Sequence, residues 1–244
     1  MDSGFYAACT ALTSRTQALD TIANNLANAS TVGFRAEHNV FSSVLAGKRA
    51  EDSDLNQAIN HYGILGGTTL DQSQGALQKT GNDLDLGIEG SGYFVVQTAS
   101  GPRYTRNGAF QVSSKGQLVT ASGDAVMGQG GVITVLPGPV SISADGTISS
   151  NGAVSGRLRI VEFPTETQLS SDGQGYYSAP AKTARNATGS NVRQGMLESS
   201  NVNPVSSMVE LVTAQRSAEM MQRTLSMFNA EIDKTATQDL PKVG

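Results

Sequence analysis

The strongest periodic pattern in the sequence lies near its C-terminal end and predicts a long amphipathic helix. Apolar residues recur there at alternating spacings of three and four, which places them on one face of an α-helix. Asn203 followed by Pro204 is typical of a helix start, because Asn caps the first turn and Pro fits the first helical position. Val205, Val209 and Val212 form a second ridge that widens the stripe. The stripe itself consists of Leu211, Ala214, Ala218, Met221, Leu225, Phe228 and Ile232.

A second helical pattern occupies the N-terminal end. Its apolar residues fall at the a and d positions of a heptad, and Arg15 takes the one vacant place. Asp2 or Ser3 suits the N-cap, and the helix is expected to run to about Asn28. One apolar stripe on such a helix requires a partner that covers it. This stripe consists of Phe5, Ala8, Leu12, Leu19, Ile22 and Leu26.

The middle of the chain, from about Gly75 to Glu198, predicts a mainly antiparallel β domain. Short runs of β-branched and aromatic residues alternate with glycine-bearing turns, and no helix-length amphipathic stretch interrupts them. The pairs Asn107-Gly108 and Asp145-Gly146 are expected to form tight hairpins with positive φ. Residues 36–74 show only a weak pattern with many polar side chains, which predicts an extended connector.

Together these patterns predict an α+β fold in which a β domain is inserted between two terminal helices that form a coiled-coil-like stem. The expected division is a discontinuous helical domain of residues 1–35 and 199–244, a connector of residues 36–74 and a β-rich domain of residues 75–198. The two stripes either cover each other within one protomer or each meet several neighbours, as in a packed tube. The broad C-terminal stripe favours the second alternative, and a contact that closes no ring generates a helical filament.

Signs of reaction chemistry are few. The two histidines, His38 and His61, lie apart in the weakly patterned connector, and no metal-binding, nucleotide-binding or nucleophile motif is complete. We therefore predict no enzyme, no cofactor and no metal site. An enzyme reading would depend on a polar cluster such as Asp83, Asp85 and Glu89, and a further alternative is a β domain that binds cell-wall glycan.

Charge and hydropathy exclude two classes of partner. The formal net charge is −4 with 16% charged residues, which argues against a nucleic-acid surface. No apolar run approaches the roughly 20 residues of a membrane span, so no membrane insertion is expected. The opening residues lack the positive charge and apolar run of a cleavable signal, although export that reads no such signal stays open. The single cysteine, Cys9, allows no intramolecular disulfide.

The stretch "NNLANASTVGF" is unusual at the end of a helix, because Asn is a poor helix former. Either the helix frays there, with Gly33 in a left-handed cap, or the amides bridge to backbone groups at a crowded interface. On the second reading Asn24, Asn25 and Asn28 satisfy backbone groups while Phe34 anchors the chain. Replacing Asn25 with Leu is then expected to impair assembly more than the stability of the monomer.

Three separated motifs give the chain a resemblance to the flagellar rod and hook axial proteins. These are "NNLANASTVGFRA", then "LDLGIEGSGYFVV" with "YTRNGAFQVSSKGQLVTASG", and finally "GMLESSNVNPVSSMVELVTAQRSAEM". They stand in the family's order and extend over nearly the whole chain. Within the family the motifs most resemble a proximal-rod subunit, with a distal-rod subunit as the alternative.

The resemblance implies a structural subunit of the periplasmic flagellar rod that transmits torque from motor to hook. Its implied partners are copies of itself, other rod proteins and, during secretion, the flagellar export apparatus, with no cleavable signal peptide. Termini that become ordered on assembly are also implied, which agrees with the poor stability of isolated helices. The two helical stripes, the Asn-rich stretch with Phe34, and the Asn201 and Asn203 pair are the expected subunit interface.

Overall fold

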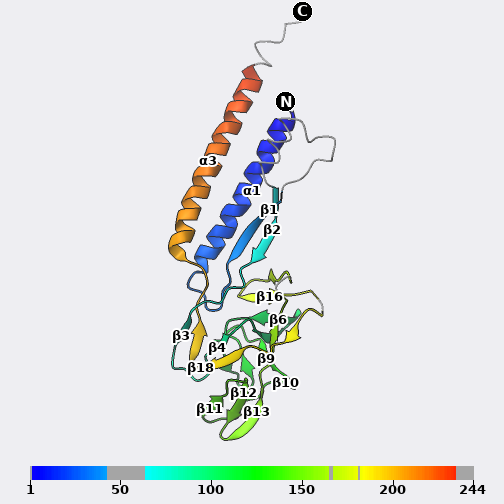
Figure 1. The fold of residues 1–244 in the computed structure, drawn as a ribbon, viewed down its shortest axis with the longest axis vertical. Helices are drawn as coiled ribbons and strands as arrows, with labels where there is room; N and C mark the ends of the chain where they lie inside the picture. The colour runs from blue at the N-terminus through cyan, green and yellow to red at the C-terminus, as the bar shows by residue number, and fades with distance from the viewer. Residues whose placement is uncertain (1, 43–63, 165–166, 181, 235–244) are drawn as a thin grey trace, which may run out of the picture. The chain divides into compact units, whose positions relative to one another are not determined.

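The structure of the chain is a computed structural model that describes residues 2–42, 64–164, 167–180 and 182–234. Figure 1 labels the helices and many of the strands, and its colour follows the chain from blue to red. In chain order they are α1 (Asp2–Ala27), β1 (Glu37–Ser42), β2 (Ile64–Leu70), β3 (Leu77–Lys79), β4 (Leu86–Glu89), β5 (Tyr93–Thr98), β6 (Gly101–Thr105), β7 (Gln111–Val112), β8 (Leu118–Val119), β9 (Ala125–Gly128), β10 (Gly131–Val132), β11 (Val140–Ile142), β12 (Thr147–Ser150), β13 (Ala153–Arg157), β14 (Ile160–Glu162), β15 (Ser170–Ser171), β16 (Tyr176–Ser178), β17 (Arg185–Asn186), β18 (Asn191–Gln194), β19 (Met196–Glu198) and α3 (Pro204–Lys234).

Contacts divide the chain into two compact units. Unit 1 contains residues 1–26, 37–68 and 203–244, and unit 2 contains residues 27–36 and 69–202. The two helices belong to unit 1 and the large sheet belongs to unit 2. The predicted α+β class with a substantial antiparallel β region is therefore confirmed. None of the described helices is long and apolar enough to span a membrane.

Helix α1 ends at Ala27, one residue before the predicted end. Its most buried side chains are small or polar and follow heptad-like spacing: Ala11, Ser14, Ala18 and Asn25. The leucines of the predicted stripe are only half-buried and lie along the edge of this buried face. Small residues at the centre of a packed face let another backbone approach closely, while longer residues cover the flanks.

Helix α3 begins at the predicted residue, and its cap is present. The Asn203 side-chain oxygen accepts hydrogen bonds from the backbone N–H groups of Val205 at 3.0 Å and Ser206 at 3.2 Å. Ala218 and Leu225 of the predicted stripe are buried. Phe228 and Ile232 also lie on α3, but their side chains are outside the described residues.

In unit 2, one large sheet is built from short antiparallel strands. Its strands follow the order β15-β16-β6-β5-β9-β8-β7, with β10 paired to β9 and β14 paired to both β5 and β17. Fully buried side chains such as Leu86, Ile88, Phe94 and Val96 form the main core. The sequence predicted these strands from short runs of β-branched and aromatic residues between turns. Strand β5 is buried on both faces, because Phe94 and Val96 belong to the main core while Tyr93 and Val95 belong to a second one.

The expected hairpins hold at one position and fail at another. Gly146 has φ of +81° between the paired strands β11 and β12, as predicted. The expectation for Asn107-Gly108 is wrong, because β6 pairs with β5 and β16 and neither residue of the pair has positive φ. Gly108 is required for a different reason: a Cβ there would overlap the carbonyl oxygen of Leu86.

The predicted connector, residues 36–74, contains paired strands. Strands β1 and β2 form a two-stranded sheet, and the backbone N–H of Asp71 donates to the carbonyl of Ala36 at 2.8 Å. Residues 43–63, which include His61, lie outside the described residues. Weak periodicity thus did not mean absence of β structure, since paired strands with few buried side chains leave little pattern.

A buried tyrosine of the main core makes the stability of the fold fall as the pH rises into the alkaline range. The Tyr176 hydroxyl donates to a carboxylate oxygen of Asp124 at 2.8 Å and lies 2.9 Å from the Thr120 hydroxyl. Burial raises the pKa of Tyr176, and Asp124 raises it further against the opposing hydrogen bond from Thr120. A pKa raised in the folded state stabilises the fold below the unfolded pKa of about 10, and this contribution disappears as pH rises through the folded pKa.

We therefore expect Tyr176→Phe to be less stable than wild type at neutral pH by about 1–3 kcal/mol, since a hydrogen bond to a charged group is lost. The difference should shrink when both proteins are unfolded with urea in alkaline buffer. A difference that stays constant from neutral to alkaline pH would contradict this account of Tyr176.

Candidate functional site

Four segments that are distant in sequence meet inside unit 2. These are residues 33–36, 71–75, 106–108 and 198–201, which we call the junction. Three of the four belong to the motifs that gave the chain its family resemblance. The first follows α1 in the chain and the last precedes α3. The junction is therefore the structural counterpart of those motifs.

At the centre of the junction lies a buried cluster of two arginines and one glutamate, the charge cluster. Glu198 accepts contacts from Arg35 Nη2 at 2.8 Å and from Arg106 Nη1 at 3.1 Å. All three side chains are 1% exposed. Arg35 also donates to the carbonyl of Ser73, and the Glu198 Oε1 atom that contacts Arg35 accepts a further hydrogen bond from the backbone N–H of Gly75 at 2.9 Å. One carboxylate thus neutralises one of two positive charges.

Backbone carbonyls and an aromatic ring hold the remaining positive charge. Arg106 donates to the carbonyls of Gly90 at 2.6 Å and Ile88 at 3.4 Å, and its Cζ lies 4.9 Å from the centre of the Tyr93 ring. Burial lowers the pKa of the Arg106 guanidinium, Glu198 opposes this effect and Arg35 reinforces it. The Nε atoms of both arginines have no hydrogen-bond partner among the described residues. Such a cluster costs desolvation energy and leaves few alternative arrangements.

Asn201 joins two of the junction segments through its side-chain amide. Its oxygen accepts from the backbone N–H of Ala36 at 2.7 Å, and its Nδ2 donates to the carbonyls of Asp71 at 3.2 Å and Ser73 at 3.1 Å. The amide side chain thereby takes the place of a peptide group in a strand. Phe34 packs beside it in a small core with Ala36 and Val202.

Close backbone approach explains two glycines of the junction. Gly33 has φ of +69°, and a Cβ there would overlap backbone atoms of Arg106 and Asn107. A Cβ on Gly75 would overlap the carbonyl oxygen of Ser199. Only glycine permits both approaches.

In unit 1, Asn25 uses its amide in the same manner. The Asn25 Nδ2 donates to the carbonyl of Glu37 at 2.8 Å, and its oxygen accepts from the N–H of the same residue at 2.9 Å. Thr21, on the same face of α1, donates to the side-chain oxygen of Asn39 at 3.1 Å. The C-terminal part of the buried α1 face therefore meets the start of β1, so the amide of Asn25 satisfies backbone groups of its own chain.

The other residues expected at an interface lie in varied surroundings. Asn24 and Asn203 are exposed, and Asn28 is half-buried and accepts from the Thr31 hydroxyl at 3.1 Å. The half-buried members on the two helices are Leu12, Leu19, Ile22, Leu26, Leu211, Ala214 and Met221. Whether these residues contact other subunits stays a prediction.

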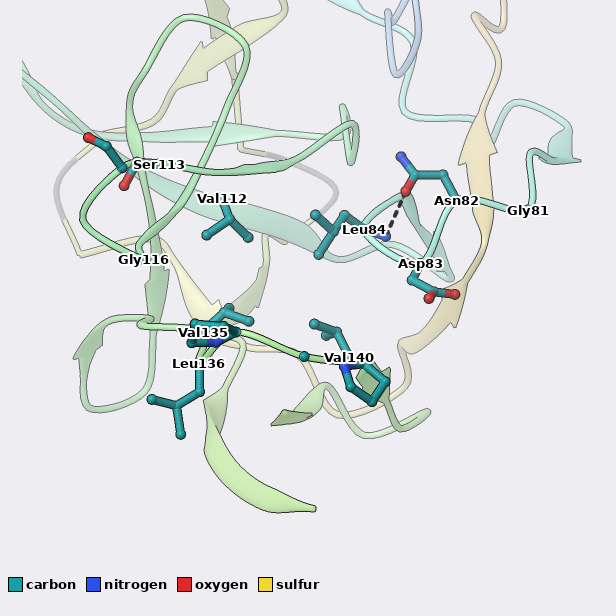
Figure 2. A pocket seen from close by; sticks show the side chains of 14 residues that line it. Gly81, Asn82, Asp83, Leu84, Val112, Ser113, Gly116, Val135, Leu136 and Val140 are labelled. Carbon is teal, nitrogen blue, oxygen red and sulfur yellow. Dashed lines mark hydrogen bonds between the residues drawn. The ribbon is translucent and has the colours of Figure 1, made fainter. Parts of the chain in front are cut away.

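The chemistry required for an enzyme is not assembled in the described part of the chain. A pocket of about 660 Å³ in unit 2 is lined by Asp83 and Asn82 on one loop and by apolar residues such as Leu136 on others (Figure 2). Asp85 is buried and accepts from Asn82 at 3.1 Å, and Glu89 pairs with Arg193 at 2.7 Å. Neither lines that pocket. The described residues also contain no group of three or more His, Cys, Asp and Glu side chains that could hold a metal ion.

The charge cluster is the feature that sequence reasoning missed. Arg35, Arg106 and Glu198 all stand inside the quoted motifs, but nothing in a single sequence says that a charged residue is buried. Their position in the sequence could have pointed to them, because the chain has few charged residues. Arg35 follows Gly-Phe, Arg106 precedes Asn-Gly and Glu198 precedes Ser-Ser-Asn. That the three charged residues contact one another can be seen only in the folded structure.

The sequence matches three family models. Residues 5–35 match "Flagella basal body rod protein", residues 87–156 match "Flagellar hook protein FlgE/F/G D1 domain", and residues 193–238 match "Flagellar basal body rod FlgEFG protein C-terminal". Arg35, Arg106 and Glu198 come from these three regions, one from each. The charge cluster is thus the point where the three matched regions touch.

Similar proteins cover the whole chain. The flagellar basal-body rod protein FlgF of Caulobacter vibrioides is 35% identical over 100% of both chains. FlgF of Salmonella typhimurium is 36% identical over 93% of this chain and 94% of its own. The flagellar basal-body rod protein FlgG of Bacillus subtilis is 34% identical over 81% of this chain and 84% of its own.

Glu198→Gln keeps the size of the side chain and removes its charge, which leaves two buried guanidinium groups without a counter-charge. We expect the free energy of unfolding to fall by about 3–5 kcal/mol, as for other broken buried ion pairs. The matched control is Glu89→Gln, whose exposed pair with Arg193 should contribute only about 0–1 kcal/mol. Urea unfolding followed by circular dichroism measures both. Equal, small losses in the two variants would contradict the role given to the charge cluster.

Asn25→Leu leaves the N–H and C=O groups of Glu37 without their side-chain partners. The structure therefore leads us to expect a loss of about 1–3 kcal/mol in monomer stability, in addition to the effect on assembly expected from sequence. Faster hydrogen exchange at the Glu37 amide would locate the loss. Asn24→Leu at the exposed neighbouring position is the control, and impaired assembly with unchanged exchange at Glu37 would overturn the intrachain role.

Proposed function

The chain belongs to the FlgF group of flagellar basal-body rod proteins, and from this premise we propose that its terminal helices form the contacts through which it polymerises. Family membership makes it a structural component of the rod in the flagellar basal body, where it interacts with other rod proteins. It also confirms the prediction that the chain is a structural protein and not an enzyme.

The observation that carries the proposal is that α3 has apolar residues on two opposite faces. One face contains the buried Ser207, Ala218 and Leu225 with half-buried residues between them. At 100° per residue the other face lies opposite, and its six apolar side chains are exposed by 47% or more of their surface. Its three valines were expected from the sequence to widen the stripe, but they lie opposite it. Its members and their exposures are Val205 72%, Met208 54%, Val209 63%, Val212 47%, Met220 62% and Met227 67%. We call this the exposed ridge.

An exposed ridge of this kind favours contact with another chain. The ridge is apolar without interruption from Val205 to Val212, and contiguous apolar surface on a monomer is an aggregation hazard unless a partner covers it. Methionine adapts its shape to irregular partners, which suits contacts with both identical and related subunits. Since the opposite face of α3 is already covered within the protomer, a second neighbour must come from outside it.

The coiled-coil-like stem is part of the same proposal. The buried positions on α1 are spaced three, four and seven apart. On α3, buried and half-buried positions alternate by four and three from Ser207 to Leu225, a spacing that suits knobs-into-holes packing. We assign residues 1–35 and 199–244 to the axial core of the rod, residues 36–74 to a connector and residues 75–198 to an outer domain. Among the predicted interface residues, those that intrachain contacts leave half-buried would then contact neighbouring subunits.

Export by the flagellar apparatus is the proposed route to the periplasm. The absence of disulfides is compatible with passage of an unfolded chain, since Cys9 is the single cysteine. In the assembled rod, helices packed on several sides would transmit torque from motor to hook. We place the subunit in the proximal rod, because the FlgF relatives match over more of the chain than FlgG of Bacillus subtilis does.

A pair of matched substitutions tests the exposed ridge. Val209→Asp places a charge on the ridge, and Val154→Asp places the same charge at an equally exposed apolar position of β13 in unit 2. Neither site is buried, so both monomers should keep wild-type stability within about 0.5 kcal/mol. We expect Val209→Asp to abolish incorporation into detergent-purified, salt-washed hook–basal bodies, measured by immunoblot, while Val154→Asp incorporates normally.

Wild-type incorporation of Val209→Asp would exclude the exposed ridge as a subunit contact without affecting the family assignment. Absence of the wild-type chain itself from washed hook–basal bodies would contradict the rod function. The two outcomes are separate because the same immunoblot includes the wild type.

A further inference from the structure

The sequence contains two Asn-Gly pairs, and both are followed by alanine. They are Asn107-Gly108-Ala109 and Asn151-Gly152-Ala153. The backbone nitrogen after an asparagine reaches the side-chain carbonyl carbon most easily when the next residue is glycine, which has no Cβ to obstruct it. Because the two sequences are identical from the asparagine to the alanine, a large difference in reactivity between the pairs must come from the fold.

The fold immobilises the first pair. The Asn107 side-chain oxygen accepts from the backbone N–H of Ala109 at 3.0 Å, and the carbonyl of Gly108 accepts from the N–H of Leu86 at 3.0 Å. Gly108 is buried and lies so close to Leu86 that no Cβ would fit. Rotation of the Asn107 side chain toward the Gly108 nitrogen therefore requires local unfolding of the junction.

The fold leaves the second pair exposed to solvent. Asn151 and Gly152 are exposed at the tip of the hairpin between β12 and β13, with φ of +52° and +81°. Nothing lies within 4 Å of where a Gly152 Cβ would be. The Asn151 backbone N–H donates to the carbonyl of Pro139 at 3.1 Å, but its side-chain amide has no hydrogen bond within the described ranges of the chain. The hairpin is a type I′ turn, which the sequence reading missed.

From this contrast we propose that Asn151 is a site of spontaneous deamidation and isoaspartate formation. The Gly152 nitrogen, after losing its proton to solvent, forms a bond to the Asn151 side-chain carbonyl carbon. The bond from that carbon to the side-chain nitrogen breaks, and ammonia leaves with protons taken from water. The resulting succinimide ring takes up one water molecule and opens at either carbonyl, which yields aspartate or isoaspartate.

The reaction changes the hairpin in two ways. It replaces a neutral amide with a carboxylate, so the formal net charge goes from −4 to −5. In the isoaspartate product the backbone runs through an additional methylene, which no longer fits the two-residue turn that pairs Ser150 with Ala153. Copies that persist longest after synthesis accumulate these changes on the surface of unit 2.

The test follows both pairs in one sample of the purified full-length protein. The protein is incubated in mildly alkaline buffer at physiological temperature, then digested and analysed by mass spectrometry for conversion of amide to acid. Isoaspartate is detected with isoaspartyl methyltransferase. We expect native Asn151 to convert more than about tenfold faster than native Asn107, because Asn107 reacts only after local opening. In urea the two rates should become similar.

Equal rates at the two asparagines in the native protein would overturn the proposal. So would a native protein in which neither asparagine converts while both convert fully in urea. Asn151→Gly supplies an independent check, since glycine keeps the positive φ and has no side-chain amide. Its isoelectric-focusing pattern should stay a single band while wild type acquires a more acidic one. An acidic band in both proteins would place the modification elsewhere and refute the assignment.

Discussion

The buried contact of Glu198 with Arg35 and Arg106 is the interaction on which the arrangement of unit 2 depends. Two guanidinium groups and one carboxylate, all 1% exposed, have lost their hydration and are held by each other, by nearby backbone groups and by the Tyr93 ring. A displaced segment would leave a charge buried without compensation. The segments that follow α1 and precede α3 in the chain must therefore meet at residue 106, whatever the rest of the sheet does.

Short amide side chains complete what the charge cluster begins. Asn201 bonds the backbone of Ala36 and Asp71, Asn25 bonds both polar groups of Glu37, and Asn203 caps α3. Each lies at a place where regular secondary structure ends and backbone groups need partners. The need for partners of these backbone groups explains Asn25, Asn201 and Asn203. The poor helix propensity of asparagine is no disadvantage at the end of a helix.

Local features of the fold were predictable from sequence, and long-range ones were not. The start of α3 at Pro204 and the end of α1 at Ala27 follow from capping residues and periodicity, which act within a few residues. The failed hairpin at Asn107-Gly108 shows the limit, because the same dipeptide serves a turn at Asn151 and a close backbone contact with Leu86 at Gly108. The charge cluster joins residues 35, 106 and 198, and no pattern within one segment reports such a pairing.

The two units differ in how they distribute apolar side chains between their interior and their surface. Unit 2 has two apolar cores of its own and pairs Glu198 with arginines inside it, and its exposed large apolar side chains, such as Leu136 and Val154, lie on different segments. In unit 1, α3 retains exposed side chains such as Val205 and Met227 on the face opposite its buried stripe. Helices gain most of their stability from packing, so α3 depends more on added neighbours than the sheet does. On the function proposed above, such a subunit would bring a packed β unit to the rod, and α3 would gain its further neighbours there.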